Sequence, residues 1–286
     1  MQTKRRGLKG YIENPVNACS LARQMFVSRK VRTIVVEGDN DRRFFEQWPS
    51  TCKFHVCNGK DLVVSVYKHY RKHYKNDAGF MWFVVDIDFD EILGGLIEDD
   101  CFMYNSLCSD FSYNDMEVFL VNTPAFEKVL SNFDIDMEEA GCIRAKLRDA
   151  SAILGSFRVS DFLIRRDNCL SRSVLNGLEV RGYFNEKRLL VDPELIDRAI
   201  RGSSGYGGLY SEDLINKARE LRKIYSNSWS LSRGHDVTEM LRLFLEARKK
   251  RLDIVSLEMM LRMACEKSYF EYSSVGKKFI DMGVWM

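Results

Sequence analysis

The sequence lacks the features that mark secreted and membrane-spanning chains. Its eight cysteines are scattered, and no two of them form the C-x-x-C pair typical of a zinc ribbon or a redox site. The longest apolar run, residues 80–85, is far too short to cross a bilayer, and the basic N-terminus is followed by no apolar signal core. We therefore expect a cytoplasmic protein in a reducing compartment, with no membrane contact.

The sequence also lacks an excess of charge of one sign. Its 43 Lys and Arg residues face 41 Asp and Glu residues, a net charge of +2, so any nucleic-acid-binding surface must be local. A content of 45% hydrophobic and 12% aromatic residues over 286 residues suffices for one large or two modest cores and excludes a disordered chain. We find no internal repeat and no low-complexity segment.

The first third of the chain alternates segments typical of strands and of helices. Short apolar or β-branched runs at 32–36, 53–57 and 80–85 enclose amphipathic helical patterns at 39–48 and 61–74. This β-α-β-α-β order predicts an α/β fold with a parallel sheet and right-handed crossovers. In such folds the functional groups gather at the carboxyl ends of the strands.

The remainder of the chain is predicted to be mainly helical. A short strand near 101–104 precedes a helix that opens around Asn114, and Thr123 with Pro124 is typical of the start of another helix, which ends at Leu130. The glycine-rich stretch 201–208 predicts a loop, and it has no G-K-[ST] ending for a nucleotide phosphate. Helical periodicity predicts further helices at 137–154, 192–200, 212–225, 237–250 and 256–270.

Carboxylates follow two of the predicted strands. Glu37 comes directly after the first strand, and Asp41 falls in the opening turn of the next helix. The third strand ends in Asp86, Asp88 and Asp90, which point the same way while the chain remains extended. Because the carboxyl ends of parallel strands share one edge of the sheet, both sets of acids are expected at that edge.

A cluster of carboxylates suits a hard divalent cation. Mg²⁺ or Mn²⁺ prefers oxygen ligands, and two such ions roughly 3.5–4 Å apart hold the attacking and leaving oxygens of a phosphodiester in line. The alternative is that acids after strands only cap the next helix, as Asp39 or Asp41 would without a metal. Three alternating acids beside Glu37 favour the metal site, because their mutual repulsion needs a cation to offset it.

The strings VVEGDND at 35–41, NGK at 58–60 and VVDIDFD at 84–90 resemble the Toprim fold of topoisomerases, primases and OLD-type nucleases. In that superfamily a glutamate after the first strand and a D-x-D after a later strand bind the metals. The resemblance implies that Glu37 is a metal ligand or a general base. It implies that Asp86 and Asp88 are metal ligands.

The chain is more closely similar to the Toprim-like nuclease family that includes AriB, the effector of the PARIS anti-phage defence pair. Three further stretches carry this similarity, namely DMEVFL at 115–120, GHD at 234–236 and the closing run 258–285. The resemblance implies a toxin-like endonuclease that cleaves nucleic acid, in particular transfer RNA, and that an ABC-type ATPase partner holds in check. It also implies that the active form is a homodimer.

These expectations give a Toprim-like Rossmannoid parallel sheet with a mostly α-helical C-terminal part. An N-terminal helical segment spans 1–30, and the Toprim-like catalytic domain spans 31–125. A mostly helical domain spans 126–286 and is the candidate interface with a second copy or the ATPase. The predicted metal ligands are Glu37, Asp41, Asp86, Asp88, Asp90 and Glu117.

Glu117 and three further residues have both a functional and a structural interpretation. Asp115 and Glu117 either add ligands and orient the metal-bound water or form the acidic first turn of a helix. Lys60 either stabilises the charge of the pentacovalent phosphorus or is solvated at a helix start. His235 is either a general acid or base, or part of an ordinary helix start.

The basic segment 68–75 interleaves cations with aromatic rings. Its histidines, His69 and His73, are one turn apart, but the Glu of the metalloprotease arrangement and a cysteine pair are missing, which disfavours zinc. The segment is either a solvated helix face or a surface that contacts phosphates and stacks on bases. The candidate nucleic-acid-binding residues are Lys68, Arg71, Lys72 and Lys75.

Two other functions stay open. The first is a catalytically silent Toprim-fold module that recognises nucleic acid or docks on an ATPase. Alternatively, the chain nicks DNA like OLD-type nucleases. Primase or topoisomerase activity is a less favoured third interpretation. A topoisomerase needs a tyrosine nucleophile on a separate domain, and this chain is too short to contain the domains that usually accompany the Toprim domain. Intact acids at all motif positions favour the nuclease.

Overall fold

The computed structural model divides into two compact units. The sheet unit consists of Met1–Ile87, Leu96–Asp110 and Lys267–Met286, and the helical unit consists of Asp88–Gly95 and Phe111–Glu266. Within the described residues, no helix is both long enough and apolar enough to span a membrane. The structure describes residues 14–74, 79–104, 114–175, 178–203, 206–226 and 228–285.

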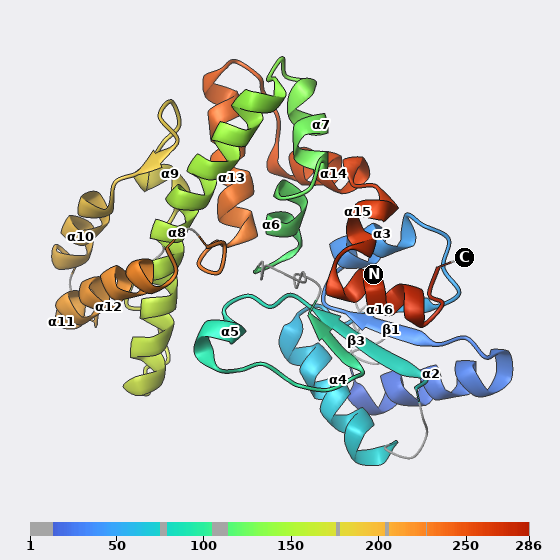
Figure 1. The fold of residues 1–286 in the computed structure, drawn as a ribbon. Coiled ribbons are helices and arrows are strands. Elements are labelled where there is room, and N and C mark those ends of the chain that lie inside the picture. Colours follow the sequence, from blue (N-terminus) through green and yellow to red (C-terminus); the bar gives the residue numbers. More distant parts are fainter. Residues whose placement is uncertain are drawn as a thin grey trace, which may run out of the picture. The chain divides into compact units, whose positions relative to one another are not determined.

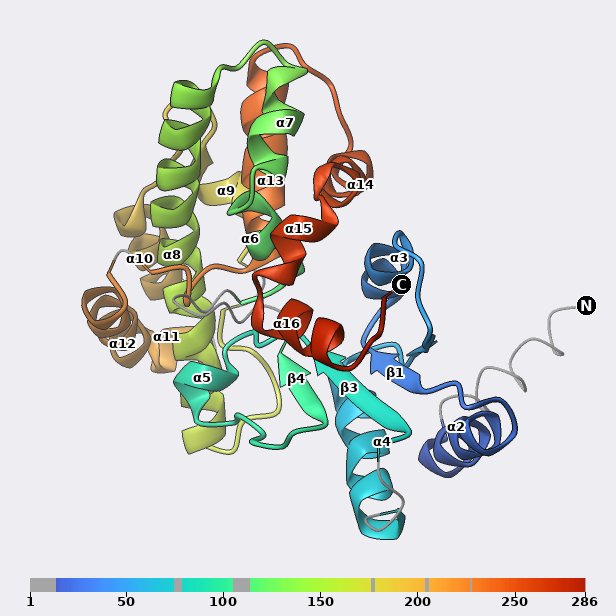
Figure 2. The ribbon, with the colours of Figure 1, turned by 45° about the vertical axis from the view of Figure 1, so that its right-hand side comes forward.

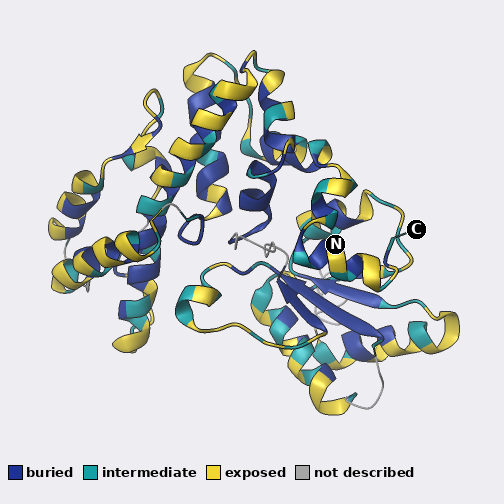
Figure 3. Cartoon of the chain, viewed as in Figure 1, coloured by how far each residue is buried: buried dark blue, intermediate teal, exposed yellow. Residues whose placement is uncertain are grey.

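The sheet unit is built on four parallel strands in the order β2-β1-β3-β4. The strands are β1 (Thr33–Val36), β2 (Lys53–Val56), β3 (Met81–Val85) and β4 (Phe102–Tyr104). Every residue of β1 and β3 is buried (Figure 3), as expected for central strands with uninterrupted apolar sequences. The predicted α/β fold with a parallel sheet is confirmed.

Helices cover both faces of this sheet. The crossover helices α3 (Asp39–Glu46) and α4 (Lys60–His73) lie on opposite faces (Figures 1 and 2). The first described helix, α2 (Pro15–Arg29), packs beside α4, where the Cys19 thiol contacts the carbonyl of Val66. Each connection therefore crosses from the carboxyl end of one strand to the amino end of the next.

The C-terminal segment belongs to the sheet unit, which differs from the contiguous domain expected for 126–286. It forms α15 (Lys267–Glu271) and α16 (Ser274–Asp281), on the same face as α3 (Figure 2). The physical reason is a set of aromatic contacts around Phe270, which is fully buried. The rings packed against Phe270 are those of Phe44, Phe45, Trp48, Phe279 and Trp285.

The helical unit is organised around the 31-residue helix α8 (Met137–Asp167). This helix is longer than the predicted 137–154. It continues past Gly155, which lies so close to the carbonyl of Leu231 that a side chain would not fit there. The remaining helices are α5 (Asp90–Leu93), α6 (Met116–Val121), α7 (Ala125–Ser131), α9 (Val180–Tyr183), α10 (Pro193–Arg201), α11 (Tyr206–Leu209), α12 (Ser211–Ile224), α13 (Gly234–Ala247) and α14 (Ile254–Ala264), with a hairpin of β5 (Phe184–Asn185) and β6 (Leu190–Val191).

Two sequence expectations in this region are wrong in detail. The single helix predicted at 256–270 is divided into α14 and α15, because Cys265 adopts an extended conformation where the chain passes from the helical unit to the sheet unit. The loop predicted at 201–208 contains most of the one-turn helix α11.

Candidate functional site

The strand order places a reversal point between β1 and β3. The chain goes from β1 through α3 to β2 on one side, and then through α4 on the other face to β3 on the opposite side of β1. Open α/β sheets bind ligands in the crevice outside the carboxyl ends of the two strands at such a reversal. Glu37 follows β1 and Asp86 follows β3, so two of the predicted acids flank this point.

Glu37 and Asp86 are joined by a hydrogen bond. The backbone N–H of Asp86 donates to Oε1 of Glu37 over 2.8 Å. The register makes this contact possible, because Val36, the last residue of β1, pairs with Val84 of β3. The Glu37 side chain therefore reaches sideways to the end of the neighbouring strand, and both acids are half-buried.

Lys60 lies at the same edge of the sheet. Its Nζ donates to the carbonyl of Ile87 over 3.1 Å and is 5.9 Å from the centre of the Tyr104 ring. The turn that delivers it is fixed by Gly59, which has φ 125° and donates its N–H to the carbonyl of Glu37 over 3.0 Å. The protein thus holds Lys60 at the edge where Glu37 lies. The alternative, a lysine that only contacts solvent at the start of a helix, differs from this position.

Asp41 caps a helix. Its Oδ2 accepts a 2.9 Å hydrogen bond from the N–H of Gly38, in the capping box that opens α3. The capping alternative is therefore observed for this residue. Its role as a metal ligand stays a prediction.

The expected alternation of Asp86, Asp88 and Asp90 is wrong. Strand β3 ends at Val85, Asp88 takes the left-handed conformation with φ 50°, and Asp90 begins the short helix α5. Aspartate tolerates this conformation better than most residues, because its short polar side chain bonds locally. The N–H of Asp88 donates to the carbonyl of Asn114 over 2.6 Å, so Asp88 is anchored in the helical unit.

The donor set at the sheet edge fits a hard divalent ion. In the described part of the chain, no group of three or more His, Cys, Asp and Glu side chains has the geometry to hold a metal ion. Mg²⁺ in phosphoryl-transfer sites typically takes only one or two carboxylates and keeps several waters. Glu37 and Asp86 would supply those two, and the wider set of Asp41, Asp88, Asp90 and Glu117 stays a prediction.

Asp115 lies in a buried polar cluster of the helical unit. It is the N-cap of α6 and accepts hydrogen bonds from the N–H groups of Val118 (3.0 Å) and Gly234 (2.5 Å). Any side chain at Gly234 would overlap with the Asp115 carboxylate. Burial and the nearby negative charge of Glu117 raise the pKa of Asp115 to about 7. The capping interpretation is observed for Asp115.

His235 pairs with a residue that the sequence pattern did not single out. Its Nδ1 lies 3.1 Å from Oε1 of Glu258, which also accepts a 3.0 Å hydrogen bond from the hydroxyl of Thr238. The hydrogen bond to Glu258 raises the pKa of His235 to about 9, and partial desolvation of the largely exposed ring opposes this only in part. Burial acts to raise the pKa of the Glu258 carboxyl, but the hydrogen bond to His235 and its charge lower that pKa overall. The raised pKa favours the imidazolium form of His235, which donates a proton rather than accepts one.

Arg262 completes the cluster around Glu117. Its Nη1 lies 3.7 Å from Oε1 of Glu117 and 3.9 Å from Oε2 of Glu258, and within the described residues it has no hydrogen-bond partner. Glu258 and Arg262 are four residues apart on α14, a spacing common on solvated helix faces. Only their burial distinguishes them, and burial is a tertiary property that the sequence pattern does not carry.

The basic segment lies at the other end of α4 from Lys60. Lys68 and Lys72 are exposed, whereas Arg71 forms a 2.8 Å ion pair with Asp99. The rings of His69 and His73 stack on each other with their centres 4.4 Å apart. Lys75 lies outside the described residues.

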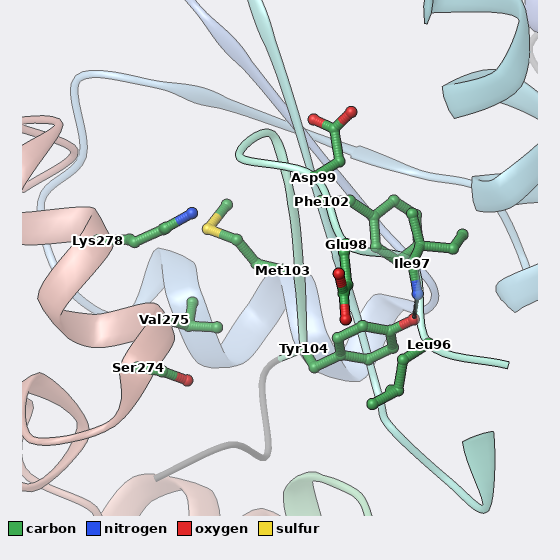
Figure 4. Close-up of a pocket in the computed structure, with 10 residues that line it drawn as sticks. All are labelled: Leu96, Ile97, Glu98, Asp99, Phe102, Met103, Tyr104, Ser274, Val275 and Lys278. Carbon is green, nitrogen blue, oxygen red and sulfur yellow. Dashed lines mark hydrogen bonds between the residues drawn. The ribbon is translucent and has the colours of Figure 1, made fainter. Parts of the chain in front are cut away.

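The sheet unit also contains an apolar cavity of about 270 Å³ beside the edge strand β4 (Figure 4). Met103 of β4 points toward Val275 and Lys278 of α16, whereas the rings of Phe102 and Tyr104 lie on the other side of the strand. There the Tyr104 hydroxyl accepts a 2.8 Å hydrogen bond from the N–H of Ile97. The lining includes no predicted catalytic, metal-binding or nucleic-acid-binding residue. The candidate site is therefore the reversal point of the sheet and not this cavity.

Comparison with protein-family models gave no matching family, and comparison with curated proteins gave no match.

Proposed function

We propose that the chain is a metal-dependent phosphodiesterase of the Toprim type that cleaves nucleic acid. One observation carries the proposal. At the point where the strand order reverses, the Glu37 carboxylate accepts a hydrogen bond from the N–H of Asp86, so the two acids that the sequence motifs single out meet at the ends of neighbouring strands. A ligand site is expected at this position of the sheet.

The residues at this edge have separable tasks. Glu37 and Asp86 would hold Mg²⁺ or Mn²⁺, which when bound supplies charge stabilisation for the phosphodiester and activates water. The ammonium of Lys60, fixed against the carbonyl of Ile87, would contact a phosphate oxygen and stabilise developing negative charge. Its fixed position keeps the reorganisation on substrate binding small.

The biological setting of this activity rests on the sequence resemblance. The proposed substrate is RNA, with transfer RNA as the first to test, and the proposed role is that of a toxin-like effector in anti-phage defence. An ABC-type ATPase would restrain the enzyme, and the active form would be a homodimer. Light scattering of the purified protein, alone and with a candidate ATPase, tests both assemblies.

The experiment is an incubation of purified protein with total cellular RNA and with plasmid DNA, in Mg²⁺ and in EDTA. The key variant is Glu37→Gln, because the amide oxygen still accepts the Asp86 N–H while the charge is lost. The matched control is Glu46→Gln, which removes an exposed carboxylate at the end of α3 in the same unit.

We expect discrete fragments in Mg²⁺ that disappear in EDTA and in Glu37→Gln but persist in Glu46→Gln. RNA fragments support the RNA-cleaving enzyme, and nicked plasmid moves the substrate to DNA. Equal cleavage by wild type and Glu37→Gln would refute the proposal. If neither substrate is cut, the assay is repeated with the candidate ATPase, and continued inactivity would refute it too.

A second candidate is a binding module without catalysis. The observation in its favour is that the described residues bring no three potential ligands into metal-binding geometry. This module would bind RNA or the ATPase equally well with Glu37→Gln as with the wild-type sequence. It would show no cleavage under any of these conditions.

A further inference from the structure

The sheet unit separates its charges between the two edges of the sheet. Helix α4 starts with Lys60 at the edge where Glu37 lies and runs antiparallel to the strands, so its last turn reaches the amino-terminal edge. Helix α2 also runs toward that edge, because its C-terminus leads directly into β1. The acids follow the strands at one edge, and the C-terminal halves of α2 and α4 lie toward the other.

These two helices form a surface with cations and almost no acids. No Asp or Glu occurs between residues 15 and 36 or between residues 62 and 74. Figure 3 shows exposed residues along the outer sides of α2 and α4. Arg71 of α4 is exposed but is paired with Asp99. The other exposed Lys and Arg residues of this surface, hereafter the α2/α4 face, are Arg23, Arg29, Lys30, Lys68 and Lys72.

Three of these cations have no acidic partner among the described residues. Lys68, Lys72 and Arg29 form no ion pair with any described residue. Arg23 lies 5.8 Å from the centre of the Tyr74 ring, a contact that links α2 to the end of α4. Lys68 and Lys72 lie one turn apart on α4, so their like charges repel, and a bound polyanion relieves the repulsion.

The aromatic rings of the face pack against other side chains of the same unit. His69 and His73 stack on each other, and Tyr74 lies next to Arg23 and packs edge-on against Phe80. Proteins that bind single strands instead offer rings on which successive bases stack. The face is therefore suited to contact phosphates, as in the recognition of a double helix, and not to stack on unpaired bases.

The length of α4 sets the size of the ligand. Twelve residues separate Lys60 from Lys72, a distance of about 18 Å at the helical rise of roughly 1.5 Å per residue. A double helix rises about 3.4 Å per base pair, so it covers this distance with about five base pairs. A ligand that contacts both ends of α4 is thus a double-helical segment rather than a short oligonucleotide.

We propose that the α2/α4 face binds the phosphate backbone of a double-helical segment of nucleic acid, at least about five base pairs long, whose end reaches the edge with Glu37 and Asp86. This inference rests on the proposed function for the identity of the polyanion. It adds that the enzyme selects a helical stem next to the bond it cuts.

The test measures binding of a labelled 20-base-pair RNA duplex and of a DNA duplex of the same length by fluorescence anisotropy, in EDTA, at several salt concentrations. Lys68→Gln with Lys72→Gln is the test variant. Lys146→Gln with Lys223→Gln is the matched control, because it also removes two exposed lysines from helices, but in the helical unit. An RNA trinucleotide is the competitor.

For the test variant we expect the salt dependence, log K against log salt, to become shallower by about 1.8 and the affinity at about 0.15 M salt to fall about thirtyfold. The control should match the wild type, and the trinucleotide should not compete. Equal salt dependence for the two double variants would overturn the proposal, as would binding of anionic phosphatidylserine vesicles but neither duplex.

The two proposals fail in different ways. If the wild type cleaves RNA and the test variant cleaves it with the same KM, the α2/α4 face does not bind substrate and the nuclease assignment stands. If the duplex binds through Lys68 and Lys72 but no cleavage occurs with or without the candidate ATPase, the face is a nucleic-acid surface and the nuclease assignment falls.

Discussion

Two substitutions of Glu37 should separate its structural role from its chemical one. Oε1 of Glu37 accepts the N–H of Asp86 over 2.8 Å. Glu37→Ala removes that acceptor, and leaving a half-buried N–H without a partner costs about 1 kcal/mol, the lower end of the usual range. Glu37→Gln keeps an acceptor and removes only the charge, so its stability in EDTA should equal or slightly exceed that of the wild type.

A divalent ion should make the wild type more stable than Glu37→Gln. A ligand at tenfold its Kd stabilises the folded state by about 1.4 kcal/mol, and the wild type alone should gain it. We therefore expect Glu37→Gln to match the wild type in EDTA and to melt below it in Mn²⁺, with a difference of about 3–6 °C for a unit of this size.

The assay is thermal unfolding followed by circular dichroism, with and without Mn²⁺, for the wild type and both variants. Glu37→Ala should melt lowest in EDTA. If Mn²⁺ raises the melting temperature of Glu37→Gln as much as that of the wild type, Glu37 is not a metal ligand. If Glu37→Ala is as stable as Glu37→Gln in EDTA, the hydrogen bond to Asp86 does not contribute as described.

Two further predictions concern the helical unit. Gly155→Ala should unfold this unit at much lower urea concentration, because the added methyl overlaps with the carbonyl of Leu231, whereas Gly141→Ala in the same helix, with open space around it, should stabilise by about 0.5–1 kcal/mol. Glu258→Gln should lower the pKa of His235 from about 9 toward 6.5, measured by NMR titration. Because the folded pKa is raised, the stabilisation from this pair is complete below pH 6.5 and disappears as the pH rises through 9, and it should be about 1 kcal/mol or less, since the imidazole is largely exposed. An unchanged His235 titration in Glu258→Gln, or equal unfolding of the two glycine variants, would contradict these assignments.

The part of the fold that depends on local pattern was predictable from the sequence. The strand at Thr33–Val36 and the strand at Met81–Val85 follow from uninterrupted apolar runs, and the helices between them follow from their periodicity. The position of Glu37 and Asp86 at one edge of the sheet follows in turn, because parallel strands share an edge, whereas the pairing of the first strand with the third comes from the structure. Lys60 was predicted as a candidate, and the turn at Gly59 explains how it reaches that edge.

The parts that depend on long-range packing were not predictable. The left-handed conformation of Asp88 breaks the alternation that a continuing strand would give, and nothing in the D-x-D-x-D string indicates it. Phe270 lies far along the chain from the rings of Phe44 and Phe45 that bury it, so the sequence order placed it in the wrong domain. Glu258 becomes a candidate site residue only because the fold buries it beside His235.

The central claim is that Glu37 and Asp86 hold a divalent ion at the reversal point of the sheet. The most direct measurement is Mn²⁺ binding followed by electron paramagnetic resonance, with wild type, Glu37→Gln, Asp86→Asn and the Glu46→Gln control. The account predicts saturable binding by the wild type and by Glu46→Gln that falls at least tenfold in affinity in Glu37→Gln and in Asp86→Asn. Equal binding by all four proteins, or none by the wild type, would contradict it.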